Sequence, residues 1–507
     1  MLPQLRRNVT AQLPAFLATQ RWFGGKARQI LGVEITDAIP VGHEEPATVV
    51  LMANVKYVEG AQETYSIPII LSAQSGGYSP EDAFSRPQFL AELLDIMERK
   101  ADVPGEKGRL RGCQATAFSE ILSVSDEARP NRLSGEQSNS SVIYGDRAIL
   151  KFFRRIEEGE NPDLEIGKFL TERARFPHAP RIAGWIEYQP QQGKPSTQAI
   201  LQEFVPNQGD AWRYALKTLS AFYEEAADAS SGRSLGQGSP SSDECREFAG
   251  EAMSRLLGDI GLLGKRTAEL HLALASERHD AAFVPEPFTM EFQSQLERSF
   301  AELASATFHL LRAHIGHVPA EYKDQCKEIV GREQQILRRF HDGLSDPIHA
   351  MRLRIHGDYH LGQVLYTGAD FVIIDFEGEP ARPLAERRIK QSPLQDVAGM
   401  LRSFHYAAFA PLLMPPADSS VSSSKSAGLR SLAQTWSRCA ADRFLRQYYE
   451  TSGAAEYLPE EDGERDSLLQ TYLLAKAIYE LGYELNNRPA WVGIPLEGIS
   501  RLLMSHD

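Results

Sequence analysis

Hydrophobic and polar positions alternate with two different periods along this chain, and the changes of period predict its organisation. Residues 4–20 place apolar side chains at helical spacing, which predicts a short amphipathic helix. The runs VEITDAI, TVVLMANVKY and ETYSIPIIL, between Val33 and Leu71, alternate as strands do. A helical pattern returns over 81–99. Together these elements predict a separate α+β module over residues 1–110.

A second strand-rich stretch covers residues 111–206. Its strand-like runs are FSEILSV, SVIYGDRAILKFF, RIAGWIEYQ and TQAILQEFV, with one helical segment between the second and the third. From residue 207 onward the long periodicities are helical, and they cover 211–228, 244–278, 288–342, 392–410, 429–450 and 466–487. Two Ser-rich stretches, 228–243 and 415–428, are expected to be loops.

Length and charge narrow the class of protein. A chain of 507 residues is too long for one compact core, so we expect two or three subdomains. A net charge of −14 and a pI near 5.5 argue against binding to nucleic acid or to an anionic membrane, because both need a basic face. No apolar run approaches membrane-spanning length, and the N-terminus makes a poor signal peptide. We therefore expect a cytoplasmic protein.

The four cysteines agree with that location. Cys113, Cys245, Cys326 and Cys439 are far apart and form no CxxC pair. This pattern favours free thiols in a reducing compartment over a disulfide framework or a zinc site.

The stretch 354–378 is the most informative part of the chain. Two short apolar runs, 364–366 and 371–374, flank a Thr-Gly-Ala-Asp turn and predict a small hairpin. One carboxylate, Asp358, precedes the first strand, and another, Asp375, follows the second.

Together with Gln363, these carboxylates match what phosphoryl transfer from a nucleotide requires. One carboxylate holds the attacking hydroxyl, while a second carboxylate and an amide oxygen bind the magnesium that bridges the phosphates. In the kinase pattern an Asn follows the first Asp by five residues, and D-F-G follows a hairpin. Here Gln363 takes the place of the Asn, and Asp375-Phe376-Glu377 replaces D-F-G. The alternative is an ordinary hairpin with solvated carboxylates, but the complete ordered set favours the kinase interpretation.

Upstream residues supply a matching nucleotide site. Lys151 lies in the strand AILKFF, where a lysine either extends outward along the sheet edge or is buried with a partner. Glu165, on the helix that begins near Pro162, is the expected partner, because a strand lysine paired with a helix glutamate holds the α- and β-phosphates in kinases.

Two further stretches complete the predicted nucleotide site. A small polar loop over 135–141 is expected to cover the phosphates, through Gln137, Ser138, Asn139 and Ser140. The end of a strand is expected to form the hinge that meets the adenine edge, through Gln202, Glu203, Phe204 and Val205. The N-terminal RWFGGKAR is ambiguous: its Gly24-Gly25 pair suits either a phosphate-binding turn or the tight packing of Trp22 and Phe23.

Four motifs, HGDYHLGQ, IDFEGEP, SPLQDVAGMLRSF and RWFGGKAR, resemble those of the bacterial maltokinases over nearly the whole chain. The first two are shared with the wider aminoglycoside-phosphotransferase-like kinases. The other two are more particular to maltokinases and close relatives, which include bacterial glucosamine kinases. The resemblance implies a bilobal, kinase-like α+β fold with an N-terminal cap subdomain (1–110), an intermediate subdomain completing the β-rich small lobe (111–206) and a helical C-terminal lobe (207–507).

The resemblance also implies an activity. Maltokinases use ATP and Mg²⁺ to convert maltose to maltose 1-phosphate for α-glucan and glycogen synthesis from trehalose, and trehalose synthase is therefore an expected partner. Glucosamine or another small sugar is the alternative acceptor. The alternative from another class is a catalytically silent pseudokinase that binds nucleotide or sugar. A protein kinase is disfavoured, because no segment ending in A-P-E follows Asp375.

Carried onto matching positions, the resemblance makes Asp358 the catalytic base and makes Gln363 and Asp375 the magnesium ligands. Asp396 and His356 are expected to hold the catalytic loop by hydrogen bonds. The two histidines that bracket Asp358, His356 and His360, lack the spacing of a zinc site and are expected to orient the loop.

The sugar site is expected on the C-terminal segment YELGYELNNRPAW, which offers aromatic faces beside carboxylates and amides. An amphipathic helix with its polar side in water would show the same pattern. The resemblance favours the sugar site, since maltokinases place their disaccharide near this helix. The expected sugar-binding residues are His360, Arg402, Tyr483, Glu484 and Trp491.

Overall fold

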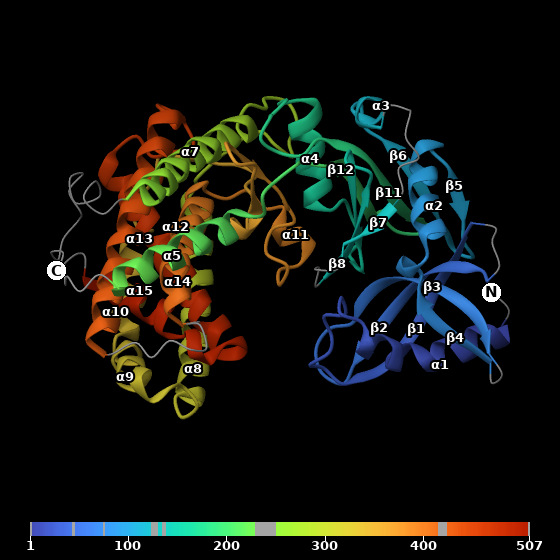
Figure 1. Ribbon diagram of the computed structural model, residues 1–507, viewed down its shortest axis with the longest axis horizontal. Coiled ribbons are helices and arrows are strands. Elements are labelled where there is room, and N and C mark those ends of the chain that lie inside the picture. Colours follow the sequence, from blue (N-terminus) through green and yellow to red (C-terminus); the bar gives the residue numbers. More distant parts are fainter. Residues whose placement is uncertain are drawn as a thin grey trace. The chain divides into compact units, whose positions relative to one another are not determined.

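The computed structural model describes residues 3–42, 46–74, 77–122, 130–133, 138–228, 250–413 and 423–504. The chain divides into two compact units (Figure 1). The first contains Met1–Pro206 together with Pro380–Arg388, and the second contains Asn207–Glu379 together with Ile389–Asp507.

The first unit begins with an antiparallel sheet covered by one helix. Its strands are β1 (Ile30–Val41), β2 (Thr48–Tyr57), β3 (Glu63–Gln74) and β4 (Gly77–Asp82). Helix α1 (Pro3–Thr19) lies along one face of this sheet (Figure 1). Val9, Leu13 and Leu17 are fully buried there, because they recur every four residues on one side of the helix.

A second, seven-stranded sheet completes the first unit, and all of its pairings are antiparallel. Its order is β5-β6-β11-β12-β9-β8-β7, made of Asp102–Pro104, Gly108–Gln114, Ile182–Pro190, Ser196–Glu203, Ala148–Phe153, Asn139–Tyr144 and Pro130–Arg132. Helix α2 (Pro87–Glu98) shares a buried core with it, and η1 (Ala83–Ser85) precedes α2. Helix α4 (Pro162–Glu172) begins with its proline in the first turn, as predicted. Strand β5 belongs to this sheet, so the second sheet begins at Asp102, before the boundary at residue 110 that was expected from the sequence.

One predicted strand is wrong. Phe118–Ile121, from the run FSEILSV, forms a short helix, α3. The amide of Ile121 donates to the Ala117 carbonyl at 3.0 Å, and Phe118 and Ile121 are both buried. An i, i+3 spacing places two side chains on the same side of a helical turn but on opposite faces of a strand, so burial of both favours the helix. The end of the run lies outside the described residues.

The two sheets of the first unit share one stretch of chain. Strand β9 of the second sheet runs on through Arg154 into β10 (Arg155–Ile156), which pairs with β3 of the first sheet. The segment Pro380–Arg388 contributes the short helix α11 (Leu384–Arg387) to this unit.

The second unit is helical around a small hairpin. Its described helices are α5 (Ala211–Asp228), α7 (Glu251–Leu274), α8 (Met290–His314), α9 (Lys323–Gly331), α10 (Glu333–Asp342), α12 (Leu394–Leu413), α13 (Ser423–Ser452), α14 (Asp462–Asn487) and α15 (Gly493–Met504). The short elements are η2 (Ala320–Tyr322), η3 (Leu361–Gln363), η4 (Pro489–Trp491), the pair β13 (Glu286–Pro287) and β14 (Met351–Arg352), and the predicted hairpin β15 (Val364–Tyr366) and β16 (Phe371–Ile373).

Helix α12 forms the centre of the second unit. Its residues are buried on all sides from Asp396 to Ala410, as expected of a helix enclosed by others. Helices α7 and α13 pack closely against each other, since a Cβ on Gly264 of α7 would lie 2.3 Å from the Phe444 carbonyl oxygen of α13. Helix α13 begins at Ser423, inside the stretch 415–428 that was predicted to be a loop. The rest of that stretch, and residues 229–243 of the other predicted Ser-rich loop, lie outside the described residues.

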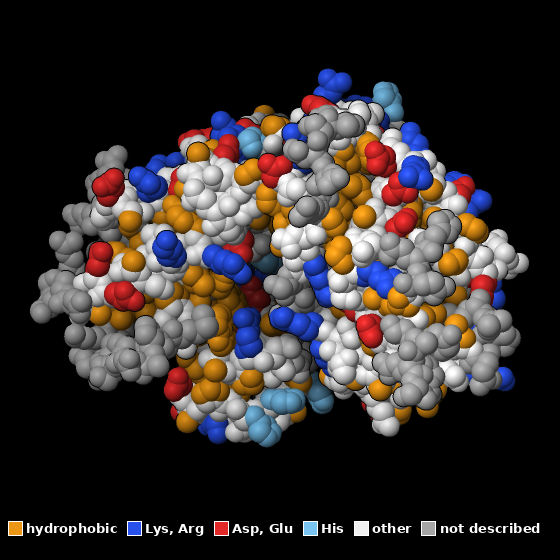
Figure 2. All heavy atoms as spheres, turned by 45° about the vertical axis from the view of Figure 1, so that its right-hand side comes forward, with side chains coloured by type: hydrophobic (Ala, Val, Ile, Leu, Met, Phe, Trp, Pro, Cys, Tyr) orange, Lys and Arg blue, Asp and Glu red, His pale blue; other side chains and the backbone are white. Residues whose placement is uncertain are grey.

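Two further expectations from the sequence meet the structure here. Cys439 is disulfide-bonded, so the expectation of four free thiols is wrong; Cys113 and Cys326 are free, and Cys245 lies outside the described residues. Acidic and basic side chains are interspersed on the face drawn in Figure 2, in keeping with the net charge of −14. Among the described residues, the helices are each too short or too polar to cross a membrane.

Candidate active site

The catalytic segment of the second unit brings its two predicted carboxylates together through two tight backbone turns. Gly357 has φ +84°, and a Cβ there would lie 3.3 Å from the Cα of Gly378, so the two turns approach closely. Asp375 itself adopts φ +68°, a left-handed conformation that costs free energy for a residue with a side chain. Such strain is retained where the surrounding structure requires it, and it is concentrated at functional sites.

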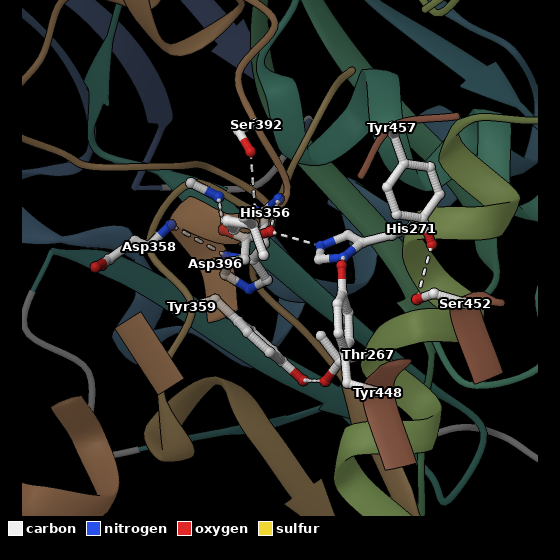
Figure 3. Close-up of polar contacts among 12 residues, drawn as sticks. Thr267, His271, His356, Asp358, Tyr359, Ser392, Asp396, Tyr448, Ser452 and Tyr457 are labelled. Carbon is white, nitrogen blue, oxygen red and sulfur yellow. Dashed lines mark hydrogen bonds and ion pairs between the residues drawn. The ribbon is translucent and has the colours of Figure 1, made fainter. Parts of the chain in front are cut away.

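Asp396 holds the turn that carries Asp358 (Figure 3). Its Oδ2 accepts from the amide of His356 at 2.8 Å, and its Oδ1 accepts from the amide of Gly357 at 2.9 Å. Asp396 is buried in the first turn of α12, so the carboxylate orients the loop and faces no solvent. These are the contacts expected of a loop-holding aspartate.

A second layer fixes Asp396 in turn. Figure 3 shows Asp396 between the catalytic loop and His271 of α7. The His271 Nε2–H donates to Asp396 Oδ2 at 3.2 Å, because a carboxylate can only accept. Its Nδ1 then accepts from the hydroxyl of Tyr448 on α13 at 2.9 Å. The chain from α13 through α7 to the loop lies entirely in the buried core.

The two histidines that bracket Asp358 both serve the loop. The His356 Nε2–H donates to the Ile374 carbonyl at 2.9 Å, and its Nδ1 accepts from the amide of Asp358 at 3.4 Å. His360 precedes η3, and its Nδ1 accepts from the amide of Gly362 at 3.1 Å. Burial lowers the pKa of His360 to about 4, so its imidazole is neutral at neutral pH.

Within the described part of the chain, the Asp358 carboxylate approaches one cation, Lys476, and the neutral imidazole of His360, both at long range. Lys476 Nζ lies 3.9 Å from its Oδ1, and His360 Nε2 lies 3.9 Å from its Oδ2. Both distances exceed those of a hydrogen bond. Burial raises the pKa of Asp358 above its ordinary value, and the charge of Lys476 opposes that shift. This combination suits a carboxylate that accepts a proton during a reaction.

Gln363 and Asp375, the predicted magnesium ligands, lie in contact. The Gln363 Nε2 donates to Asp375 Oδ2 at 2.9 Å. This places an amide and a carboxylate side by side at the two ends of the hairpin, where their oxygens can bind a hard cation. The donor set therefore fits Mg²⁺.

In the first unit, Lys151 contacts a carboxylate of α4. Its Nζ lies 3.0 Å from Oδ2 of Asp163, which is buried in the first turn of the helix. Glu165, the partner expected from the sequence, accepts from Arg388 NH2 at 2.6 Å. Lys151 therefore contacts the predicted helix through Asp163, which becomes a further candidate residue of the nucleotide site.

The predicted phosphate loop and hinge are partly described. Gln137 lies outside the described residues; Ser138 precedes β8, which begins at Asn139. Ser140 is buried, and its hydroxyl accepts from Arg154 Nε at 2.8 Å, so this side chain supports the loop from behind.

The hinge residues follow the strand β12. Gln202 pairs with Ile149 and Ile182 in the sheet. The Glu203 carboxylate accepts from Arg181 Nε at 2.8 Å. The amide of Phe204 donates to the Arg147 carbonyl at 2.7 Å, and Val205 continues beyond the strand.

The C-terminal segment has many internal contacts. Glu484 is buried; its Oε2 accepts from Arg488 Nε at 2.9 Å, and its Oε1 accepts from the Tyr406 hydroxyl at 3.1 Å. Burial raises the pKa of Glu484, while Arg488 opposes the shift. The Trp491 ring lies 6.3 Å from that of Tyr406, and the Arg488 guanidinium lies 4.5 Å above Trp491. Tyr483 is 47% exposed.

Arg402, another predicted sugar ligand, lies in the core. Its side chain is 4% exposed, its Nε donates to Glu480 Oε2 at 2.8 Å, and its NH1 lies 2.8 Å from His405 Nδ1. A sugar cannot reach a guanidinium in this position without displacing the helices around it. The structure therefore favours a supporting role for Arg402, in which it holds Glu480 on α14.

Helix α14 adds Lys476, which the sequence had not indicated, and places it beside Tyr479 of the predicted sugar segment. Lys476 approaches Asp358, and the hydroxyl of Tyr479 donates to Glu379 Oε1 at 2.9 Å. Lys476, Tyr479 and Tyr483 recur on successive turns of one helix face. The motif YELGYEL contains the spacing of Tyr479 and Tyr483. Only the folded structure shows that this face of the helix is directed toward Asp358.

The sequence is similar to that of several known proteins. Residues 16–82 match the family described as Maltokinase N-terminal cap domain. A glucosamine kinase of Mycolicibacterium smegmatis is 27% identical over 294 residues, which are 57% of this chain and 62% of that relative's length. A glucosamine kinase of Streptacidiphilus jiangxiensis is 24% identical over 376 residues, or 73% of this chain and 72% of the relative.

Solved structures show the same fold. A crystal form of glucosamine kinase superposes with a TM-score of 0.64 at 20% identity, covering 98% of this chain and 99% of that one. A glucosamine kinase in complex with glucosamine, ADP and inorganic phosphate superposes with a TM-score of 0.62 at 20% identity, over 93% and 95% of the two chains. The chain is therefore similar to the maltokinase cap over residues 16–82, is similar in sequence to glucosamine kinases over a longer stretch, and shares their kinase-like fold.

Proposed function

We propose that this protein is an ATP-dependent sugar kinase. The observation that carries the proposal is Asp358: Asp396 holds the backbone turn just before it, and among the described residues the nearest cation to its carboxylate is Lys476, at 3.9 Å. Asp358 accepts the proton of the sugar hydroxyl as that oxygen attacks the terminal phosphorus of ATP. The bond between that phosphorus and the bridging oxygen breaks, and ADP leaves.

Gln363 and Asp375 would hold Mg²⁺ at the ends of the hairpin. Bound there, the ion would neutralise negative charge on the phosphates. Asp375 contributes a full negative charge and Gln363 a neutral oxygen, so the carboxylate is the stronger ligand of the two. In the first unit, Lys151 would bind the phosphates of the nucleotide. Asp163 and Glu165 are the carboxylates of α4 proposed to accompany it in that site.

Maltose, phosphorylated at its anomeric hydroxyl to maltose 1-phosphate, is the proposed acceptor. Support comes from the maltokinase-type cap and from helix α14, which joins the base to the candidate sugar residues. Lys476 near Asp358 and the exposed Tyr483 are two turns apart, about 10 Å along the helix. A two-ring sugar can bridge such a span, with one ring at the base and the other on the aromatic side chain. Supply of the product to α-glucan synthesis and association with trehalose synthase belong to this proposal.

Glucosamine is the second candidate acceptor. It is favoured by the two relatives named glucosamine kinase. The acidic side chains around the loop also favour a cationic sugar, since Glu379 and Asp358 both lie near α14.

A panel assay tests both levels of the proposal. Mg²⁺-dependent ADP release is measured with maltose, glucosamine, glucose and no sugar, and the phosphate position in the product is determined by NMR. Formation of maltose 1-phosphate supports the full proposal. Glucosamine phosphorylation without maltose turnover would replace the acceptor and keep the kinase, while nucleotide binding without turnover of any sugar would favour a pseudokinase.

A further inference from the structure

A fully buried arginine links the cap to the nucleotide-binding sheet. Arg154 follows β9 and precedes β10, so it lies where the chain passes from the second sheet to the first. Its side chain has no exposed surface. A buried guanidinium needs compensating partners, because its desolvation is costly.

The partners of Arg154 come from both sides of the junction. On the cap side, its NH2 donates to both carboxylate oxygens of Asp82, at 2.9 and 3.0 Å. On the other side, its Nε donates to the hydroxyl of Ser140 at 2.8 Å. Asp82 is also the last residue of the region that matches the cap family. The guanidinium therefore bridges the end of the cap to the strand β8.

Aromatic side chains fix the plane of the guanidinium. Its central carbon lies 4.5 Å from the ring of Trp22, within the motif RWFGGKAR, and 4.4 Å from the ring of Phe84. The planar guanidinium lies against these rings while two of its nitrogens donate to two partners, NH2 to Asp82 and Nε to Ser140, and a single lysine ammonium cannot reproduce that geometry. This contact gives Trp22 a packing role and accounts for the aromatic part of the N-terminal motif.

The other end of the bridge leads to the nucleotide residues. Ser140 belongs to the predicted phosphate loop and pairs with Phe152 across the sheet, and its neighbour Ser141 pairs with Lys151. Arg154 itself lies three residues after Lys151, directly beyond the end of β9. A shift of Arg154 would therefore move both the base of the loop and the strand that carries the phosphate-binding lysine.

We propose that Arg154 is a positioning residue through which the cap sets the geometry of the nucleotide site. The bridge Asp82–Arg154–Ser140 holds the base of the phosphate loop and the strand of Lys151 in the arrangement that binds ATP. This inference rests on the proposed kinase function and adds a role for the cap, namely support of nucleotide affinity.

The test compares Arg154→Lys and Ser140→Ala with Arg155→Ala. Arg155 is adjacent in sequence and makes an exposed cap contact with Glu63 at 3.4 Å, but the cap–loop bridge does not include it. Binding of a fluorescent ADP analogue is measured by titration, thermal unfolding reports folding, and KM is determined separately for ATP and sugar. Ser140→Ala keeps the Asp82 contact and cuts only the link to the loop.

We expect Arg154→Lys to weaken ADP-analogue binding and raise the ATP KM about tenfold, with the sugar KM unchanged. Ser140→Ala should shift both quantities in the same direction by a smaller factor, and Arg155→Ala should leave them at wild-type values. Folded Arg154→Lys and Ser140→Ala variants with wild-type nucleotide affinity would overturn the inference. Wild-type protein that binds no nucleotide would overturn the kinase proposal and this inference together, whereas nucleotide binding without sugar turnover would reject only the activity.

Discussion

Two polar segments of the second unit, the catalytic stretch 354–378 and the C-terminal stretch 479–491, look equally rich in chemistry but use their charges differently. The Asp358 carboxylate lies 3.9 Å from the Lys476 ammonium and 3.9 Å from the neutral imidazole of His360, and neither distance is that of a hydrogen bond. The carboxylates of the C-terminal stretch are tightly paired, Glu480 with Arg402 at 2.7 Å and Glu484 with Arg488 at 2.7 Å. A carboxylate proposed to accept a proton has to stay free of a permanent ion pair. A buried carboxylate that stabilises a helix needs such an ion pair, because its charge is otherwise uncompensated.

Loss of the Asp375 carboxylate is expected to have the largest effect. Asp375→Ala removes the charged member of the proposed Mg²⁺ pair and should abolish phosphoryl transfer, because a neutral amide alone binds a hard cation weakly. Steady-state rates over a Mg²⁺ titration measure this. Gln363→Asn, which restores the commoner kinase ligand, is the matched control and should keep part of the activity. A normal Mg²⁺ dependence in Asp375→Ala would place the metal elsewhere.

Asp358→Asn comes next. The amide keeps the shape of the side chain but cannot accept the proton, so kcat should fall by ~10²–10⁴-fold. Nucleotide affinity and thermal stability should remain those of the wild type, since the loop is held by the separate carboxylate of Asp396. Unchanged turnover in Asp358→Asn would show that Asp358 is not the catalytic base.

The pH dependence of activity sharpens the contrast. Burial raises the pKa of Asp358, so the deprotonated form needed for catalysis is lost as pH falls through that raised value, at a higher pH than for an exposed aspartate. The profile of kcat/KM against pH should show this acid limb. Lys476→Met removes the cation that lowers the pKa, so it should move the limb further toward neutral pH. If the acid limb of the profile lies at the same pH in Lys476→Met as in the wild type, the limb reports the ionisation of a group other than Asp358.

The smallest effect is expected in the C-terminal stretch. Trp491→Ala should raise the sugar KM about tenfold, or by about 1.4 kcal/mol of binding, with little change in the ATP KM. Arg488 and Tyr406 already contact the Trp491 ring, so part of the change comes from their rearrangement. Tyr483→Phe, which keeps the exposed ring, is the control and should behave as the wild type. An unchanged sugar KM in Trp491→Ala would leave the stretch with a purely structural role.

Local chain spacing was sufficient to predict the catalytic hairpin. Its strands, its turn and the contact between Gln363 and Asp375 depend on residues fewer than twenty apart, so periodicity and turn chemistry indicate them directly. The turn that carries Asp358 depends in addition on the more distant Asp396. The α+β division, the strand-rich first unit and the helical second unit were predictable for the same reason, because burial of one face imposes a period on each element.

Tertiary structure decided which polar groups are paired. The sequence indicated Glu165 for Lys151, yet Asp163, on the same first turn, lies at 3.0 Å, because the angle at which α4 meets the sheet sets which side chain points inward. Lys476 lies more than a hundred residues from Asp358 along the chain, and Arg402 is buried against Glu480. Periodicity reports which face of an element is apolar, but a long-range ion pair depends on how distant elements pack, and that information appears only in the folded chain.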